Sequence, residues 1–77
     1  MTGSNKTKAV IITREIKVRR ERLGMQQTEL AAKAGIRQSS LSLIEKGSRN
    51  PSVPVLARIA AALGCTMDDL TRTERAD

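Results

Sequence analysis

Apolar side chains recur at helical spacing along most of the chain. The first predicted helix starts near Ile12 or at Thr13, its candidate N-cap, and ends at Gly24. Its apolar stripe contains Ile12, Ile16 and Leu23. The β-branched run Val10–Ile12 could instead form a short extended segment, so the pattern leaves the start of this helix open.

Turn residues separate three further helices. The second runs from Gln27 to Lys33 or Ala34, and the third runs from Gln38 to Lys46. A fourth has Ser52 as its N-cap and Gly64 at its end. Thr66–Asp69 resembles a capping box for a short fifth helix, with Asp where Glu or Gln is usual.

No strand pattern of useful length is apparent beside these helices. The sequence therefore predicts an all-α fold, a compact bundle of five short helices joined by tight turns. Residues 1–11 are expected to form a flexible N-terminal arm, residues 12–70 the helical domain, and residues 71–77 a short C-terminal tail.

Composition narrows the function. The 77 residues suffice for one small domain, and its core must be aliphatic because Phe, Trp and Tyr are absent. With no His and a single Cys, Cys65, the chain offers no general base of the usual kind, no metal ligand set and no intramolecular disulfide. We therefore expect no catalysis and no cofactor.

Charge points to a polyanionic partner. The net charge is +6, and most of the excess lies in residues 1–23. In so small a domain this favours nucleic acid before a membrane surface, although a solvated helix face would look the same. The longest apolar run, residues 9–12, is too short to span a bilayer, and nothing resembles a signal peptide. We expect a cytoplasmic protein.

The segment Gln27–Lys46 has the spacing of two short helices that cross at a steep angle. Ala31 is small where the helices touch, and Gly35 allows a positive φ in the turn. Ile36, Leu41 and Ile44 fill the wedge between the helices and the core. This pattern predicts a helix-turn-helix, in which the second helix enters the DNA major groove.

At this point the chain resembles the lambda-repressor and Cro type of helix-turn-helix protein, the XRE family, from about Ile16 to Leu70. The matching segments, in family order and spacing, are Arg20–Gly24, Gln27–Ala31, Gly35–Ile36, Ser39–Gly47, Arg49–Ser52, Ala60–Thr66 and Asp69–Leu70. The resemblance implies a lambda-repressor-like DNA-binding domain.

Helix geometry places one face of the third predicted helix toward DNA. Leu41 and Ile44 share the buried side, so the opposite side and the N-terminal turn are free to reach base edges. The predicted base-reading set, which agrees with the family's contact positions, is Arg37, Gln38, Ser39, Ser42 and Leu43. Gln38 suits a bidentate pair with adenine. Arg37 could read guanine or hold a phosphate, and Leu43 could touch a thymine methyl or be an ordinary surface leucine.

Other positions are expected to bind phosphate or to hold the fold. The resemblance implies phosphate contacts at Gln27, at the start of the second helix, and at Arg49 and Asn50. Lys46 is a further candidate, and Ser52 is another, although its capping role alone would explain it. Helix phase and the family pattern together predict a partly buried ion pair between Arg20 and Glu45.

The sequence thus predicts a sequence-specific double-stranded DNA-binding transcriptional regulator. Because one module reads only a few base pairs, we expect a homodimer on a palindromic operator. The alternative is an antitoxin-like or coactivator-like protein-interaction module of the same fold. Its partner would be a toxin or RNA polymerase.

Overall fold

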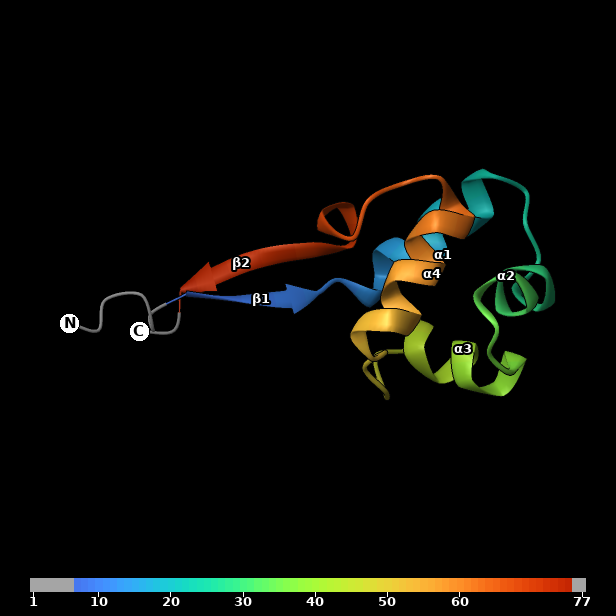
Figure 1. Ribbon diagram of the computed structural model, residues 1–77, viewed down its shortest axis with the longest axis horizontal. Coiled ribbons are helices and arrows are strands. Elements are labelled where there is room, and N and C mark those ends of the chain that lie inside the picture. Colours follow the sequence, from blue (N-terminus) through green and yellow to red (C-terminus); the bar gives the residue numbers. More distant parts are fainter. Residues whose placement is uncertain (1–6, 76–77) are drawn as a thin grey trace.

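Helices and a pair of strands divide the chain between a rounded body and a projecting ribbon (Figure 1). The computed structural model describes residues 7–75. The elements, in chain order, are β1 (Thr7–Ile11), α1 (Thr13–Arg22), α2 (Gln27–Ala34), α3 (Gln38–Glu45), α4 (Val53–Leu63), the 3-10 turn η2 (Asp68–Leu70) and β2 (Thr71–Arg75).

One aliphatic core lies between the helices. Ile16, Leu30, Leu41, Ile59 and Leu70 are its largest fully buried side chains, and they come from five different elements. Small residues complete it where α2 meets its neighbours, namely Ala31, Ala34 and Ala60. Because these side chains end at Cβ, helix backbones approach closely, and a core without aromatic rings is filled.

The turn between α2 and α3 has the predicted geometry. Gly35 has a φ of +68°, and the N–H of Ile36 donates to the carbonyl of Ala31 at 3.0 Å. Arg58 on α4 adds a bond from Nε to the carbonyl of Ala34, at 2.9 Å. These contacts satisfy carbonyls at the end of α2 and fix the direction in which α3 leaves the turn.

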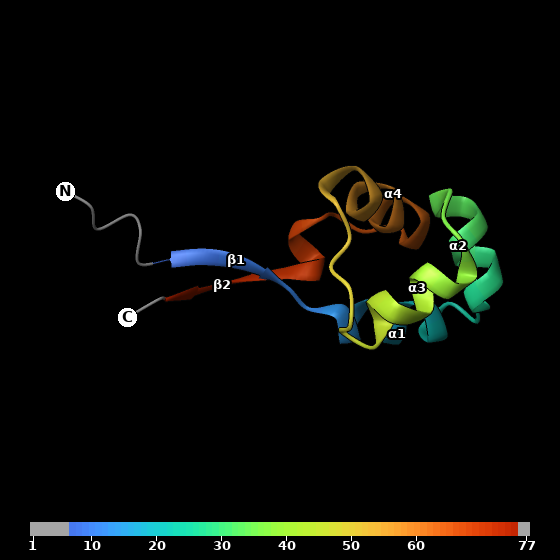
Figure 2. The same ribbon diagram turned by 90° about the horizontal axis from the view of Figure 1, so that it is seen from below.

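The two ends of the described chain meet in a two-stranded antiparallel sheet. β1 pairs with β2 in a register that runs from Thr7 opposite Arg75 to Ile11 opposite Thr71. The N–H of Ile12 donates to the carbonyl of Leu70 at 2.8 Å and joins the sheet to the helical body. In two perpendicular views the strands extend away from the helices (Figures 1 and 2).

Two fold predictions were wrong. Within residues 7–75 there are four α-helices and not five, and two strands occupy residues 7–11 and 71–75. The rest of the expected arm and tail, residues 1–6 and 76–77, lies outside the described residues. The extended alternative for Val10 and Ile11 was the right one. The β-branched residues gave a local sign of β1, but the pairing left none, since each strand depends on a partner at the other end of the described chain.

The capping box at Thr66–Asp69 forms but does not start a full helix. The N–H of Thr66 donates to Asp69 Oδ2 at 2.9 Å, and the N–H of Asp69 donates to Thr66 Oγ1 at 3.2 Å. Only one 3-10 turn follows, because the carbonyl of Leu70 accepts the N–H of Ile12 and Thr71 enters β2.

Of three other local predictions, one was confirmed and two were wrong. Ser52 caps α4 as predicted, accepting the N–H of Val55 at 3.4 Å. Thr13 is not an N-cap, since Ile12 holds that position and its side chain makes no capping bond. Leu23 is 56% exposed and does not join the core, because α1 ends at Arg22 and Gly24 turns the chain away.

An ion pair ties α1 to α3. Arg20 Nε lies 2.8 Å from Glu45 Oε2, and Arg20 Nη2 lies 3.1 Å from Glu45 Oε1. Arg20 Nη1 also donates to the carbonyl of Met25 at 2.9 Å. The Arg20 and Glu45 side chains are 11% and 4% exposed. The hydrogen bond to Glu45 raises the pKa of Arg20 against the opposing effect of burial, so the guanidinium keeps its charge.

Arg20→Ala should lower the free energy of unfolding by about 3 kcal/mol, because Glu45 would keep a buried charge without its partner. Urea denaturation at neutral pH measures this. The matched control is Arg19→Ala, whose pair with Glu15 is 31% exposed on both sides. This control should cost less than about 1 kcal/mol. Equal losses in the two variants, or an unchanged melting temperature for Arg20→Ala, would contradict the prediction.

Asp69→Ala should destabilise the protein at pH 7 but not in acid. The bond from the Thr66 N–H, with the side-chain bond to Thr66, lowers the pKa of Asp69 below its ordinary value. A carboxyl whose pKa is lowered by folding stabilises the fold above its unfolded pKa, and this stability is lost as pH falls through the folded pKa. The difference in melting temperature from the wild type should close below about pH 4. Asp68→Ala, which breaks no bond to Thr66, should give a smaller difference, and a gap that persists in acid would argue against this role.

Candidate nucleic-acid interface

The outward face of α3 carries uncharged polar side chains. Leu41 and Ile44 are buried on the inner face, while Gln38 and Ser39 are exposed and Ser42 is half-buried. Arg37 is the exposed N-cap residue of the helix. The five residues of the predicted base-reading set therefore lie at the N-terminal turn of α3 or away from its core side.

Leu43 is the one apolar side chain in the predicted base-reading set. It is half-buried and lies outside the group of partly buried apolar side chains that pack on the core. Its backbone carbonyl accepts the N–H of Ser48 at 2.9 Å, which holds the turn after α3. An apolar side chain beside Ser42 and Ser39 adds a patch suited to a methyl group on the outward face.

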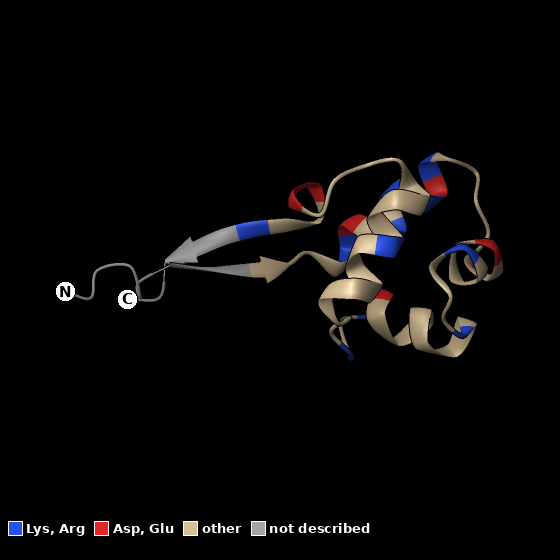
Figure 3. Ribbon diagram, viewed as in Figure 1, with Lys and Arg blue, Asp and Glu red and all other residues tan. Residues whose placement is uncertain are grey.

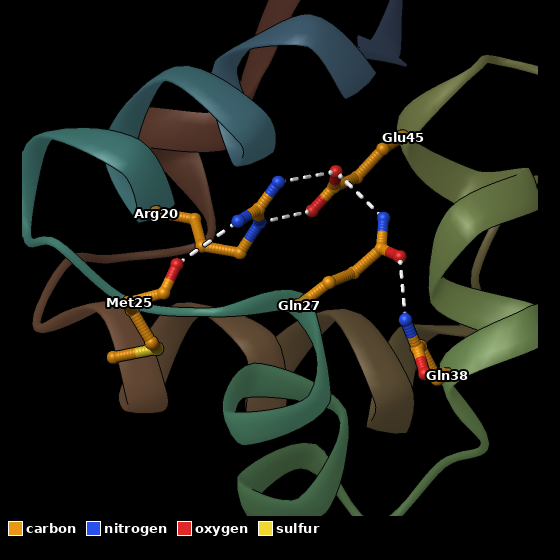
Figure 4. Close-up of polar contacts among 5 residues, drawn as sticks. All are labelled: Arg20, Met25, Gln27, Gln38 and Glu45. Atoms are coloured by element: carbon orange, nitrogen blue, oxygen red, sulfur yellow. Dashed lines mark hydrogen bonds and ion pairs between the residues drawn. The ribbon is translucent and has the colours of Figure 1, made fainter.

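Two glutamines form a bridge from the core to this face (Figure 4). Gln27, at the start of α2, donates from Nε2 to Glu45 Oε1 at 3.1 Å. Its Oε1 accepts a bond of 3.3 Å from Gln38 Nε2. Sequence reasoning assigned Gln27 to a phosphate and Gln38 to a base without detecting that the two amides meet. Only their common position as the first residues of α2 and α3 could have suggested it.

The remaining predicted phosphate residues follow α3. Lys46, Arg49 and Asn50 are exposed. Arg49 Nη1 donates to Ser40 Oγ at 3.1 Å, which directs its guanidinium back over α3. Ser52 is exposed but its hydroxyl accepts the capping bond from Val55. The structure thus brings basic and polar groups together at the C-terminal end of α3. The hydroxyl of Ser52 accepts the capping bond and keeps its own hydrogen to donate.

An open groove of about 710 Å³ lies between α1, the α1–α2 loop and α3. The residues that line it include Lys17, Gln27, Ser42, Glu45 and Lys46. Lys17 was not among the predicted residues. Its place one helical turn before Arg20 was the available signal, because residues three apart share a helix face.

Basic side chains lie on the elements around α3 and not on the helix itself. The helix itself has no Lys or Arg, while Figure 3 shows basic residues on α1, α2 and α4 and in the loops beside α3. Such an arrangement separates neutral groups that can pair with base edges from cations that can neutralise phosphates.

Other chemistry finds little support in the described part of the chain. Residues 7–75 contain no group of three or more His, Cys, Asp or Glu side chains able to hold a metal ion. Burial raises the pKa of the Cys65 thiol, which disfavours the reactive thiolate. No described helix is both long and apolar enough to cross a membrane.

Comparison with known proteins gives a consistent result. A helix-turn-helix family model, HTH_3, matches residues 16–70. The HTH-type transcriptional regulator y4dJ of Sinorhizobium fredii is 43% identical over 54 residues, which are 70% of this chain and 69% of the relative.

Solved structures with the same fold include two regulators. The restriction-modification controller protein C.AhdI of Aeromonas hydrophila has a TM-score of 0.74 and 27% identity, over 77% of this chain and 89% of its own. SinR, a master regulator for biofilm formation solved in complex with DNA, has a TM-score of 0.73 and 38% identity, over 78% of this chain and 97% of its own. SinR has also been solved in complex with the SinI protein. The chain belongs to the XRE-type helix-turn-helix family of DNA-binding transcriptional regulators.

Proposed function

We propose that this regulator reads a specific double-stranded DNA sequence by placing α3 in the major groove. The observation that carries the proposal is the outward face of α3, where Gln38, Ser39 and Ser42 are accessible while the apolar face is buried. A helix held in this way offers hydrogen-bonding groups to base edges without disturbing the core. The similarity to SinR, solved with DNA, supports the proposal.

Gln38 is the principal base-reading residue, with Arg37, Ser39, Ser42 and Leu43 beside it. An amide can accept from adenine N6 and donate to adenine N7 at the same time. Hydroxyls at Ser39 and Ser42 accept or donate and therefore discriminate less. Leu43 contacts a thymine methyl, which accounts for an apolar side chain on an otherwise polar face.

Residues on either side of α3 bind the DNA phosphates that border the major groove. Gln27 lies at the start of α2, where Gln26 gives no side-chain cap and backbone N–H groups remain available to an anion. Lys46, Arg49 and Asn50 follow α3, and Ser52 adds a hydroxyl. Lys17 joins this set, because it lines the same groove of the protein as Lys46.

Two copies bind as a homodimer to a palindromic operator. A single α3 reaches only a few base pairs, and two related half-sites about one helical turn apart give the affinity of a regulator. A second candidate function, interaction with a protein partner, is favoured by one observation. SinR, 38% identical to this chain, forms a complex with SinI. Failure to bind any duplex at low salt would favour this second function.

Selection of bound sequences from a random duplex pool tests the main proposal. The wild type should enrich a palindrome whose half-sites lie about one helical turn apart. Gln38→Ala should abolish the preference at one symmetric pair of positions, at a cost of about 1–3 kcal/mol for the favoured base. Retention of the full wild-type preference by Gln38→Ala would remove this residue from the base-reading set.

Arg49→Ala should weaken binding to all duplexes and leave the selected sequence unchanged, because a phosphate contact carries no base information. The slope of log affinity against log salt should become shallower by about 1. Fluorescence anisotropy across a salt series measures both. Lys33→Ala is the control, since Lys33 lies on α2 near Glu29, with a 3.9 Å ion-pair distance, and outside the proposed interface. An unchanged slope for Arg49→Ala would assign Arg49 to its bond with Ser40 alone.

A further inference from the structure

A continuous series of hydrogen bonds leads from a buried cation to the base-reading face (Figure 4). Arg20 binds both carboxylate oxygens of Glu45, and Glu45 Oε1 also accepts from Gln27 Nε2 at 3.1 Å. Gln27 Oε1 then accepts from Gln38 Nε2 at 3.3 Å. The first two residues are nearly buried, and the last one is exposed. The series therefore links the interior to solvent in three steps.

The chemistry of the groups gives this series one direction only. A guanidinium only donates and an ionised carboxylate only accepts, so Glu45 can receive nothing but an N–H from Gln27. The carbonyl end of the Gln27 amide is thereby turned toward Gln38, and Gln38 donates an N–H to it. Rotating either amide by half a turn would place two acceptors or two donors against each other.

We propose that the Arg20–Glu45 pair is a positioning pair for base recognition, which acts through Gln27 to fix the orientation of the Gln38 amide. This inference rests on the proposed reading of DNA by α3. With one N–H bound to Gln27, Gln38 presents its carbonyl oxygen and its second N–H in a fixed order. A base edge with a donor beside an acceptor matches that order, and adenine in the major groove has one.

The anchoring explains why an exposed glutamine can discriminate. The bond between Gln38 and Gln27 is long and exposed, so by itself it would leave the Gln38 amide free to rotate in water. Its partner is held by Glu45, whose side chain is only 4% exposed and is fixed by two bonds to Arg20. Binding then requires no ordering of the amide, and a base that needs the opposite orientation is disfavoured.

Two substitutions interrupt the series at different points. Gln27→Met removes the connecting amide and leaves the ion pair in place. Glu45→Gln replaces an obligate acceptor by an amide that can turn either end toward Gln27. Because Glu45→Gln also leaves Arg20 without a countercharge, the double variant Arg20→Met with Glu45→Gln removes both charges together and protects the fold. Thermal unfolding verifies that each variant is folded.

The readout is base preference in selection from a random duplex pool. At the positions that Gln38→Ala identifies, the preference for adenine should fall about tenfold in Gln27→Met and in the double variant. Preferences at all other positions should persist. A role of the pair in stability alone would lower the melting temperature without changing these ratios, and loss of a phosphate contact at residue 27 would weaken all sequences equally.

Glu29→Gln is the matched control for the change in charge. It neutralises a carboxylate on α2 that is 52% exposed and outside the series, so it should strengthen binding to all duplexes and leave base preference unchanged. Folded variants that keep the full adenine preference would overturn the positioning role while leaving DNA reading intact. A wild-type protein that enriches no sequence would overturn both.

Discussion

The guanidinium of Arg20 is the point at which three parts of the domain meet. Arg20 lies on the buried side of α1. Its guanidinium donates to Glu45 on α3 and to the carbonyl of Met25 in the α1–α2 loop. An aliphatic core of this size orients helices only loosely, since Leu and Ile contacts have no direction. The fork of N–H groups does have direction, and it fixes how α1, the loop and α3 lie relative to one another.

Features that depend on near neighbours could be predicted from the sequence. α2, α3 and the turn at Gly35 follow from apolar spacing and from a residue that must adopt a positive φ. The pairing of the strands could not be predicted, because Ile11 and Thr71 lie far apart in the sequence; only the β-branched residues of β1 left an extended segment open. The same contact shortened the expected fifth helix, since the carbonyl of Leu70 already bonds to Ile12.

The candidate site, like the fold, could be predicted only in part from the sequence. Which side of α3 faces outward was implied by the positions of Leu41 and Ile44. The meeting of Gln27 with Gln38, and the place of Lys17 on the groove, required the crossing angle of three helices. A helical phase gives the direction of a side chain, but the direction of an amide within it depends on which partner lies opposite.

The hydrogen-bond series also distinguishes between the residues that could replace Gln38. Gln27 presents a carbonyl oxygen at this point, so a residue that keeps this bond must donate to it. Asn, Ser, Lys or Arg could do so, each with a different preference for bases. Asp or Glu, which would suit cytosine, would oppose that oxygen unless Gln27 rotated, and rotation would turn its carbonyl against Glu45. With Gln27 held by Glu45, cytosine reading by a carboxylate at residue 38 therefore requires a change in the interior as well.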